Sequence, residues 1–178
     1  TGPEYAGRFA DLVRQDPGIE VSLNSFVSKL DGSLEMSYLR PGALVDVKAG
    51  AVILATGCRE RTREMITIPG MRPAGVFPAG LAQKMVNIEG WLPGTEAVIA
   101  GSGDIGLIMA RRLTLEGVKV KAVVEIKPEP SGLARNVAQC LDDFGIPLYL
   151  RHRISFIHGA DRVSKVTVSR VAENGSDE

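Results

Sequence analysis

Residues 97–106 read Ala-Val-Ile-Ala-Gly-Ser-Gly-Asp-Ile-Gly, and this stretch decides the fold class. The four leading apolar residues are typical of a strand that is buried on both faces of a parallel sheet. The glycines that follow form the pattern GxGxxG, which lies between that strand and a predicted helix over residues 105–116. Three glycines alone make a weak signal. Their place between a strand and a helix makes the stretch a candidate dinucleotide-binding turn.

Each glycine of this turn has a physical role in that interpretation. Gly101 permits the tight turn, Gly103 lets the backbone approach a pyrophosphate, and Gly106 lets helix and strand pack closely. The N–H groups of the first helical turn, together with the helix dipole, would hold the phosphate charge. The alternative is that the glycines only form a compact corner between strand and helix. The cofactor-binding residues predicted in the turn are Gly101, Ser102, Gly103, Asp104, Ile105 and Gly106.

Two acidic residues bear on the choice of cofactor. Glu125 lies near the end of the next predicted strand, residues 118–126, where a carboxylate would accept hydrogen bonds from the adenosine ribose hydroxyls. Its charge would repel the extra phosphate of NADP, so NAD is the expected cofactor and NADP is less favoured. Asp104 either stabilises the dipole of its own helix or places an opposing charge where the pyrophosphate belongs. The sequence leaves both alternatives open.

The rest of the pattern predicts an α/β protein, with a Rossmann-like parallel sheet, flanking helices and a small antiparallel β meander. Helices are expected over residues 4–15, 79–88, 105–116 and 133–144. Strands are expected over residues 19–23, 26–30, 34–39 and 43–47 of the meander, and over residues 51–55, 97–100, 118–126 and 146–150 of the parallel sheet. A terminal hairpin is expected from residues 154–158 and 163–171.

Composition excludes several classes of function. The 178 residues carry 21 Lys plus Arg and 21 Asp plus Glu, and this balance favours neither nucleic acid nor an anionic membrane surface as a partner. No apolar run approaches the ~20 residues of a membrane span, and no secretory signal opens the sequence. Cys58 and Cys140 are expected to be free, small, buried residues in the cytoplasm. His152 and His158 have no neighbours that indicate a metal site, and none is predicted.

Three motifs in a fixed order resemble the pyridine nucleotide-disulfide oxidoreductases, flavoproteins of the glutathione reductase type. Ala55-Thr56-Gly57 follows an apolar run, Ile68-Pro69-Gly70 comes about a dozen residues later, and GxGxxG follows. The resemblance implies an NAD-binding domain inserted into an FAD-binding domain. Residues 1–63 would be a partial FAD-binding segment and residues 64–178 the NAD(P)-binding domain, with Ala55, Thr56 and Gly57 lining the FAD site.

A narrower resemblance points to the FAD-dependent subunits of opine oxidase and hydrogen cyanide synthase. It rests on the glycine turn, on Arg59-Glu60-Arg61-Thr62-Arg63, and on residues 133–136 and 140–145. It implies that the intact protein moves hydride between nicotinamide and flavin. The implied partners are the rest of the FAD domain and either other oxidase subunits or a second copy of the chain. The start at Thr1 and the polar residues 174–178 predict a piece of a longer polypeptide.

Departures from the family pattern keep a second function open. No CxxC dithiol follows Ile68-Pro69-Gly70, so disulfide reduction is not expected, and no catalytic residue is assigned to this chain. Many family members carry a tyrosine at the position of Asp104 and a glutamate at that of Ile108. The alternative is therefore a non-catalytic structural or subunit-docking domain with a degenerate nucleotide pocket.

Overall fold

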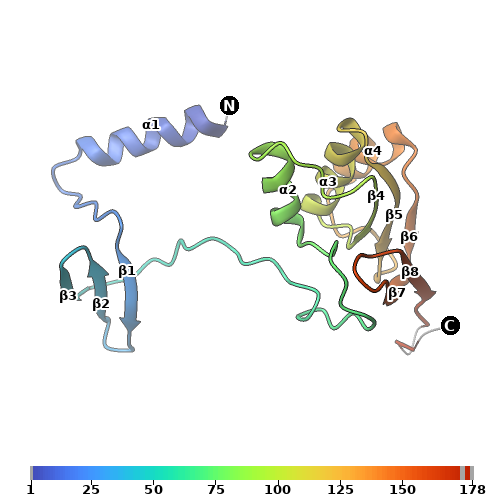
Figure 1. Cartoon of the computed structure of the whole chain (residues 1–178). Helices are drawn as coiled ribbons and strands as arrows, with labels where there is room; N and C mark the ends of the chain where they lie inside the picture. The colour runs from blue at the N-terminus through green and yellow to red at the C-terminus, as the bar shows by residue number, and fades with distance from the viewer. Residues whose placement is uncertain (1, 173–174, 177–178) are drawn as a thin grey trace. The chain divides into compact units, whose positions relative to one another are not determined.

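The computed structural model describes residues 2–172 and 175–176, so most of the predicted polar tail lies outside the described residues. The chain divides into two compact units, Thr1–Gly57 and Cys58–Glu178 (Figure 1). This division comes earlier than the boundary predicted after Arg63. The reason is that Glu60 and Arg63 make their hydrogen bonds inside the second unit. The assignment of an FAD-binding segment and an NAD(P)-binding domain stays a prediction.

The first unit contains one helix and an antiparallel meander, as predicted. Helix α1 (Gly2–Gln15) precedes strands β1 (Phe26–Leu30), β2 (Glu35–Arg40) and β3 (Ala43–Lys48), which pair in the order β1-β2-β3. The carboxylate of Asp31 holds the first turn of the meander, because it accepts hydrogen bonds from the N–H groups of Ser33 and Glu35.

Two predicted strands of this unit are wrong. Residues 19–23 form turn and irregular structure, and residues 51–55 form no strand. The side chains of Ile53 and Leu54 are 91% and 73% exposed instead of buried in a parallel sheet. A strand persists only where a neighbour satisfies its backbone hydrogen bonds, and within the described residues no strand pairs with either segment.

The second unit contains the predicted parallel sheet. Strands β4 (Glu96–Ala100), β5 (Lys119–Glu125) and β6 (Leu148–Leu150) pair in parallel, with β5 in the middle. Helices α2 (Ala79–Asn87), α3 (Asp104–Leu115) and α4 (Ala134–Cys140) alternate with these strands along the chain. A 3-10 turn, η1 (Asp142–Phe144), follows α4. Helix α3 contacts α2, α4, β4 and β5, so it is the centre of the helical layer.

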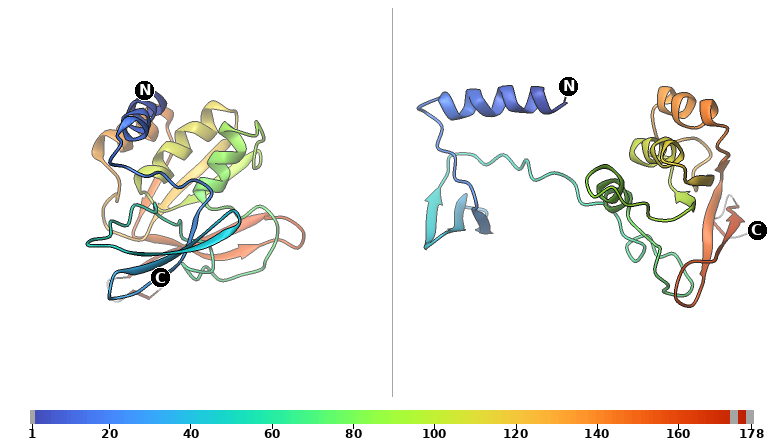
Figure 2. Two further views of the ribbon diagram at one scale, coloured as in Figure 1. Left: turned by 90° about the vertical axis from the view of Figure 1, so that its left-hand side faces the viewer. Right: turned by 45° about the horizontal axis from the view of Figure 1, so that its top comes forward.

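Both faces of the second half of β5 are covered, and the apolar residues 122–124 are buried there. The main core joins Leu107 and Leu113 of α3 to Val123 of β5, and it includes the buried Cys140. The hairpin of β7 (His152–His158) and β8 (Lys165–Arg170) contacts β5 through β7. The two views of Figure 2 show the helices and this hairpin on different sides of the parallel sheet. The burial of Cys140 matches its predicted role in packing and raises the pKa of its thiol.

Candidate functional site

The glycine turn joins the end of β4 to the start of α3. Gly101 has a φ of +100°, a conformation that side chains rarely adopt, and its N–H donates to the carbonyl oxygen of Val124 at 2.7 Å. A Cβ atom on Gly106 would lie 2.6 Å from the carbonyl oxygen of Gly101. The turn and the close helix–strand contact predicted for these two glycines are therefore present.

The N-terminus of α3 is open. Gly103 precedes the first helical residue, and in the described part of the chain no side-chain hydrogen bond caps this helix start. The N–H groups of a first helical turn have no partner within the helix, so they can bind an anion. A Cβ atom added to Gly103 would meet no atom within 4 Å. Donors that lack a partner and open space in front of them fit the phosphates of a dinucleotide.

Asp104 turns its carboxylate toward α4. Its Oδ1 accepts a hydrogen bond from the N–H of Leu133 at 2.8 Å and another from the Asn136 side-chain amide at 2.7 Å. These two bonds, with the charge of Arg135, hold the pKa of Asp104 below its usual value. The carboxylate thus serves to tie the starts of two helices together, which the sequence could not determine. Ile108, one helical turn further along α3, is exposed.

We predict that Asp104→Asn removes an acid-sensitive part of the stability. The lowered pKa of Asp104 means that its ionised form stabilises the fold above the ordinary aspartate pKa of about 4. This contribution disappears as the pH falls through the lower pKa of the folded state. Thermal unfolding should show the variant melting a few degrees below wild type at pH 7, with the gap closing as the pH falls below about 4. Asp143→Asn is the control for loss of one nearby charge, and a gap that is independent of pH would contradict the prediction.

Ser102 and Glu125 form the buried centre of the site. Oε2 of Glu125 accepts hydrogen bonds from the Ser102 N–H at 3.0 Å and the Ser102 hydroxyl at 2.6 Å, while Oε1 accepts one from the Lys127 N–H at 3.0 Å. The exposed fractions of Ser102 and Glu125 are 0% and 4%. Burial raises the pKa of Glu125, but hydrogen bonds from Ser102, Lys127 and Ser131 outweigh it, and the net shift is downward. Glu125 is therefore ionised at neutral pH, and the ribose-binding role expected of it stays a prediction.

A segment that covers this centre could not be located from the sequence. The N–H of Ser131 donates to the Ser102 hydroxyl at 2.9 Å, and the Ser131 hydroxyl donates to Oε2 of Glu125 at 3.1 Å. Beside it, a Cβ atom on Gly132 would lie 2.9 Å from the carbonyl oxygen of Ser102. Ser-Gly marks a turn, and that is the one signal that pointed here. Which turn it would cover depends on the tertiary structure.

The three residues predicted to line an FAD site belong to the first unit. Ala55, Thr56 and Gly57 are exposed and belong to no helix or strand. Cys58, expected to be buried, is exposed and free. The cause is the same as for residues 51–55, because a buried position needs neighbouring strands to cover it. By itself, this segment does not enclose a flavin.

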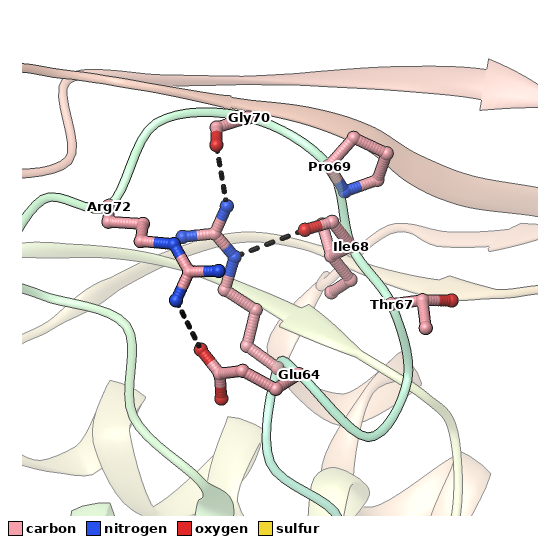
Figure 3. A pocket seen from close by; sticks show the side chains of 7 residues that line it. Glu64, Thr67, Ile68, Pro69, Gly70 and Arg72 are labelled. Carbon is pink, nitrogen blue, oxygen red and sulfur yellow. Dashed lines mark hydrogen bonds and ion pairs between the residues drawn. The ribbon is translucent and has the colours of Figure 1, made fainter.

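The Ile-Pro-Gly motif is held by an arginine. The guanidinium of Arg63 donates to the carbonyl oxygens of Ile68, Gly70 and Met71. Figure 3 shows the motif around a polar cavity of about 270 Å³ whose lining includes Arg72 and Glu64. Because all three nitrogens of Arg63 bind the chain itself, this arginine has a structural role. None of the residues that line the cavity belongs to the glycine turn.

The described residues contain no group of three or more His, Cys, Asp or Glu side chains that could bind a metal ion. No described helix has both the length and the apolar composition needed to cross a bilayer.

Comparison with known proteins identifies the family. A family model described as pyridine nucleotide-disulphide oxidoreductase matches residues 3–177. The chain belongs to this family. Hydrogen cyanide synthase subunit HcnB of Pseudomonas protegens is 29% identical over 94% of the chain and 39% of its own length. Sarcosine oxidase subunit alpha of Rhizobium meliloti is 34% identical over 70% of the chain and 14% of its own length. The chain thus spans less than half the length of these curated relatives.

Solved structures of this family share the fold. Thioredoxin reductase of T. acidophilum superposes with a TM-score of 0.66 at 18% identity, over 100% of this chain and 55% of that protein. A ferredoxin reductase from Rhodopseudomonas palustris superposes with a TM-score of 0.59 at 24% identity, over 92% of this chain and 40% of that protein. Together with the sequence relatives, they establish an oxidoreductase family with an FAD/NAD-binding fold, as the resemblance implied.

Proposed function

We propose that this chain carries the dinucleotide-binding domain of an FAD-dependent oxidoreductase that moves hydride between nicotinamide and flavin in the intact protein. The observation that carries the proposal is the open N-terminus of α3, where Gly103 leaves space in front of the helix amides. Backbone N–H groups and the helix dipole at such a site favour a diphosphate. Family membership supports the same conclusion.

The chain's own residues bind and orient in this function. Gly101, Gly103 and Gly106 shape the turn, while the N–H groups of Asp104 and Ile105 at the helix start would bind the phosphates. When bound, nicotinamide and flavin supply the hydride chemistry. No side chain of this unit is proposed to take part in the chemical step. The domain's task is to position the cofactor.

We propose NAD as the cofactor in preference to NADP. Glu125 keeps its negative charge at neutral pH because hydrogen bonds lower its pKa, and it lies at the end of β5 where a 2′-phosphate would approach. Repulsion between these anions disfavours NADP even when the carboxylate is buried, because buried charges are poorly screened.

The flavin site is proposed to need further structure. Residues 53–57 are exposed, and the apolar side chains Tyr5, Phe9 and Leu12 of α1 lie on the surface of the first unit. The remainder of an FAD-binding domain would cover such surfaces, and other oxidase subunits or a second copy of the chain are alternative occupants.

The two free cysteines fit a reducing compartment such as the cytoplasm.

Gly103→Ala tests the proposed site. The new Cβ atom meets no protein atom, so we expect the melting temperature to stay unchanged or to rise slightly. The same atom occupies the space where the phosphate must approach the backbone, so NADH affinity should fall at least about tenfold. Calorimetric titration of the full chain with NADH measures this change, and Gly32→Ala in the first unit is the control. No response of the wild-type chain to millimolar NADH would refute the proposal.

The second candidate function is a structural or subunit-docking domain with a degenerate nucleotide pocket. It is favoured by the internal hydrogen bonds of Glu125, which leave few acceptor sites for a ribose. Asp104→Ala separates the two candidates. A large gain in NADH affinity would mean that charge suppresses a pocket of the correct shape. Unmeasurable binding by both wild type and variant would mean that the shape is lost.

A further inference from the structure

Glu125 occupies the place from which a family acidic residue would reach the ribose, but its surroundings differ from those of an open ligand site. A carboxylate offers about four acceptor positions. Four donors of the chain already point at this one, namely the Ser102 N–H and hydroxyl, the Ser131 hydroxyl and the Lys127 N–H. Three of them converge on Oε2, so only Oε1, which accepts the Lys127 N–H alone, keeps an acceptor position, and Glu125 is 4% exposed.

The donors come from two separate segments. Ser102 belongs to the glycine turn, and Lys127 and Ser131 belong to the segment after β5. The Ser131 N–H also donates to the Ser102 hydroxyl, so the two segments are linked both directly and through the carboxylate. A buried network that is fully satisfied is rigid, and the loss of one member leaves charged or polar groups without partners.

We propose that Glu125 positions the phosphate-binding turn, instead of serving as the ligand of the cofactor's ribose. This inference rests on the proposed function, because it concerns how that same site binds a dinucleotide. The Ser102 N–H donates to Oε2 of Glu125, so it is not available to a phosphate. This bond fixes the peptide that precedes Gly103, and with it the direction of the N–H groups at the start of α3. Ser131 contributes to the same positioning, because it donates hydrogen bonds to the Glu125 carboxylate and to the Ser102 hydroxyl.

Ser131 offers the sharpest test because its substitution leaves the charge of Glu125 unchanged. If Glu125 positions the turn, Ser131→Ala loosens it, and the affinities for NADH and NADPH fall together by about three- to tenfold. Ser131→Thr retains the hydroxyl and should recover most of the loss. If Glu125 is the ribose ligand, Ser131 competes with the cofactor. In that case Ser131→Ala strengthens NADH binding, and this result would overturn the inference.

A second measurement needs no nucleotide. Glu125→Gln presents a single acceptor oxygen in place of two, so the N–H of Ser102 or of Lys127 loses its strong acceptor. Amide hydrogen exchange of the full chain should then be at least about tenfold faster at one of these residues. Glu129→Gln, which removes an exposed charge from the same segment, is the matched control and should leave both rates unchanged.

The nucleotide titrations and the hydrogen-exchange measurements together distinguish a failure of the inference from a failure of the proposed function. If the wild-type chain binds neither NADH nor NADPH, the proposed function fails, and the exchange rates still decide whether Glu125 anchors the turn. Faster exchange in Glu125→Gln than in Glu129→Gln supports the anchor. Equal rates in the two variants would overturn it.

Discussion

Replacing Gly106 with alanine is expected to destabilise the second unit and to abolish tight nucleotide binding. Alanine normally stabilises a helix relative to glycine by up to about 1 kcal/mol. At this position the new Cβ atom would lie 2.6 Å from the carbonyl oxygen of Gly101, which is backbone and cannot rotate away. Helix α3 must therefore shift against β4. Overpacking of this kind costs about 1–3 kcal/mol.

The effect of Gly106→Ala on binding should exceed its effect on stability. The shift moves the helix N–H groups relative to the turn. Misplacing interacting groups by about 1 Å can cost about 100-fold in the rate of an enzyme reaction, and we expect NADH affinity to fall by a comparable factor. Chemical denaturation and NADH titration measure the two effects separately. Gly7→Ala in α1 is the matched control, because its Cβ atom meets nothing within 4 Å and should raise stability instead. A Gly106→Ala protein with wild-type stability would show that the helix–strand contact is looser than described.

Gly70→Ala is expected to have the largest effect on stability. Gly70 has a φ of +119°, and a Cβ atom there would lie 2.4 Å from both the N and the O atom of Ile157. Two hydrogen bonds join these segments, from the Ile157 N–H to the Pro69 carbonyl oxygen at 3.0 Å and from the Met71 N–H to the Ile157 carbonyl oxygen at 2.8 Å. The substitution should break both bonds and force a strained backbone, at a cost of about 3 kcal/mol or more.

Gly90→Ala isolates the backbone part of that cost. Gly90 has a φ of +70° but nothing within 4 Å of its Cβ position, so its substitution carries the left-handed penalty of about 1–2 kcal/mol without a clash. Thermal unfolding of both variants should show a clearly larger loss for Gly70→Ala. Equal losses would mean that the contact between the Ile-Pro-Gly motif and β7 contributes nothing beyond the conformation of glycine.

The elements of the second unit could be predicted because their signals are local. An apolar strand, three glycines and an amphipathic helix follow one another. The local preference of each agrees with the packing it has in the fold. Residues 51–55 are as apolar as residues 97–100 of β4, yet Ile53 and Leu54 are exposed. The apolar composition of this segment is suited to a buried strand, but no described strand pairs with it. For the same reason the expected burial of Cys58 is wrong.

The backbone geometry of the glycine turn could be predicted from the sequence, but the side-chain contacts around it could not. Gly101 and Gly106 were assigned from spacing, and the structure contains the turn and the close approach that this spacing requires. The direction of the Asp104 carboxylate was open, because it depends on where α4 begins in space. The covering role of Ser131 was missed, since it lies 29 positions from Ser102 in the sequence.

The sequence alone indicates the α/β class, the order of strands and helices in the second unit, and the glycine turn that we propose to hold a diphosphate. These follow from periodicity and from the conformations that glycine alone adopts, and both are properties of short stretches of chain. Only the tertiary structure decided which donors surround Glu125, where Asp104 points, and which apolar strand finds partners. A hydrogen bond between distant segments depends on how the helices and strands pack, and no local pattern records that packing.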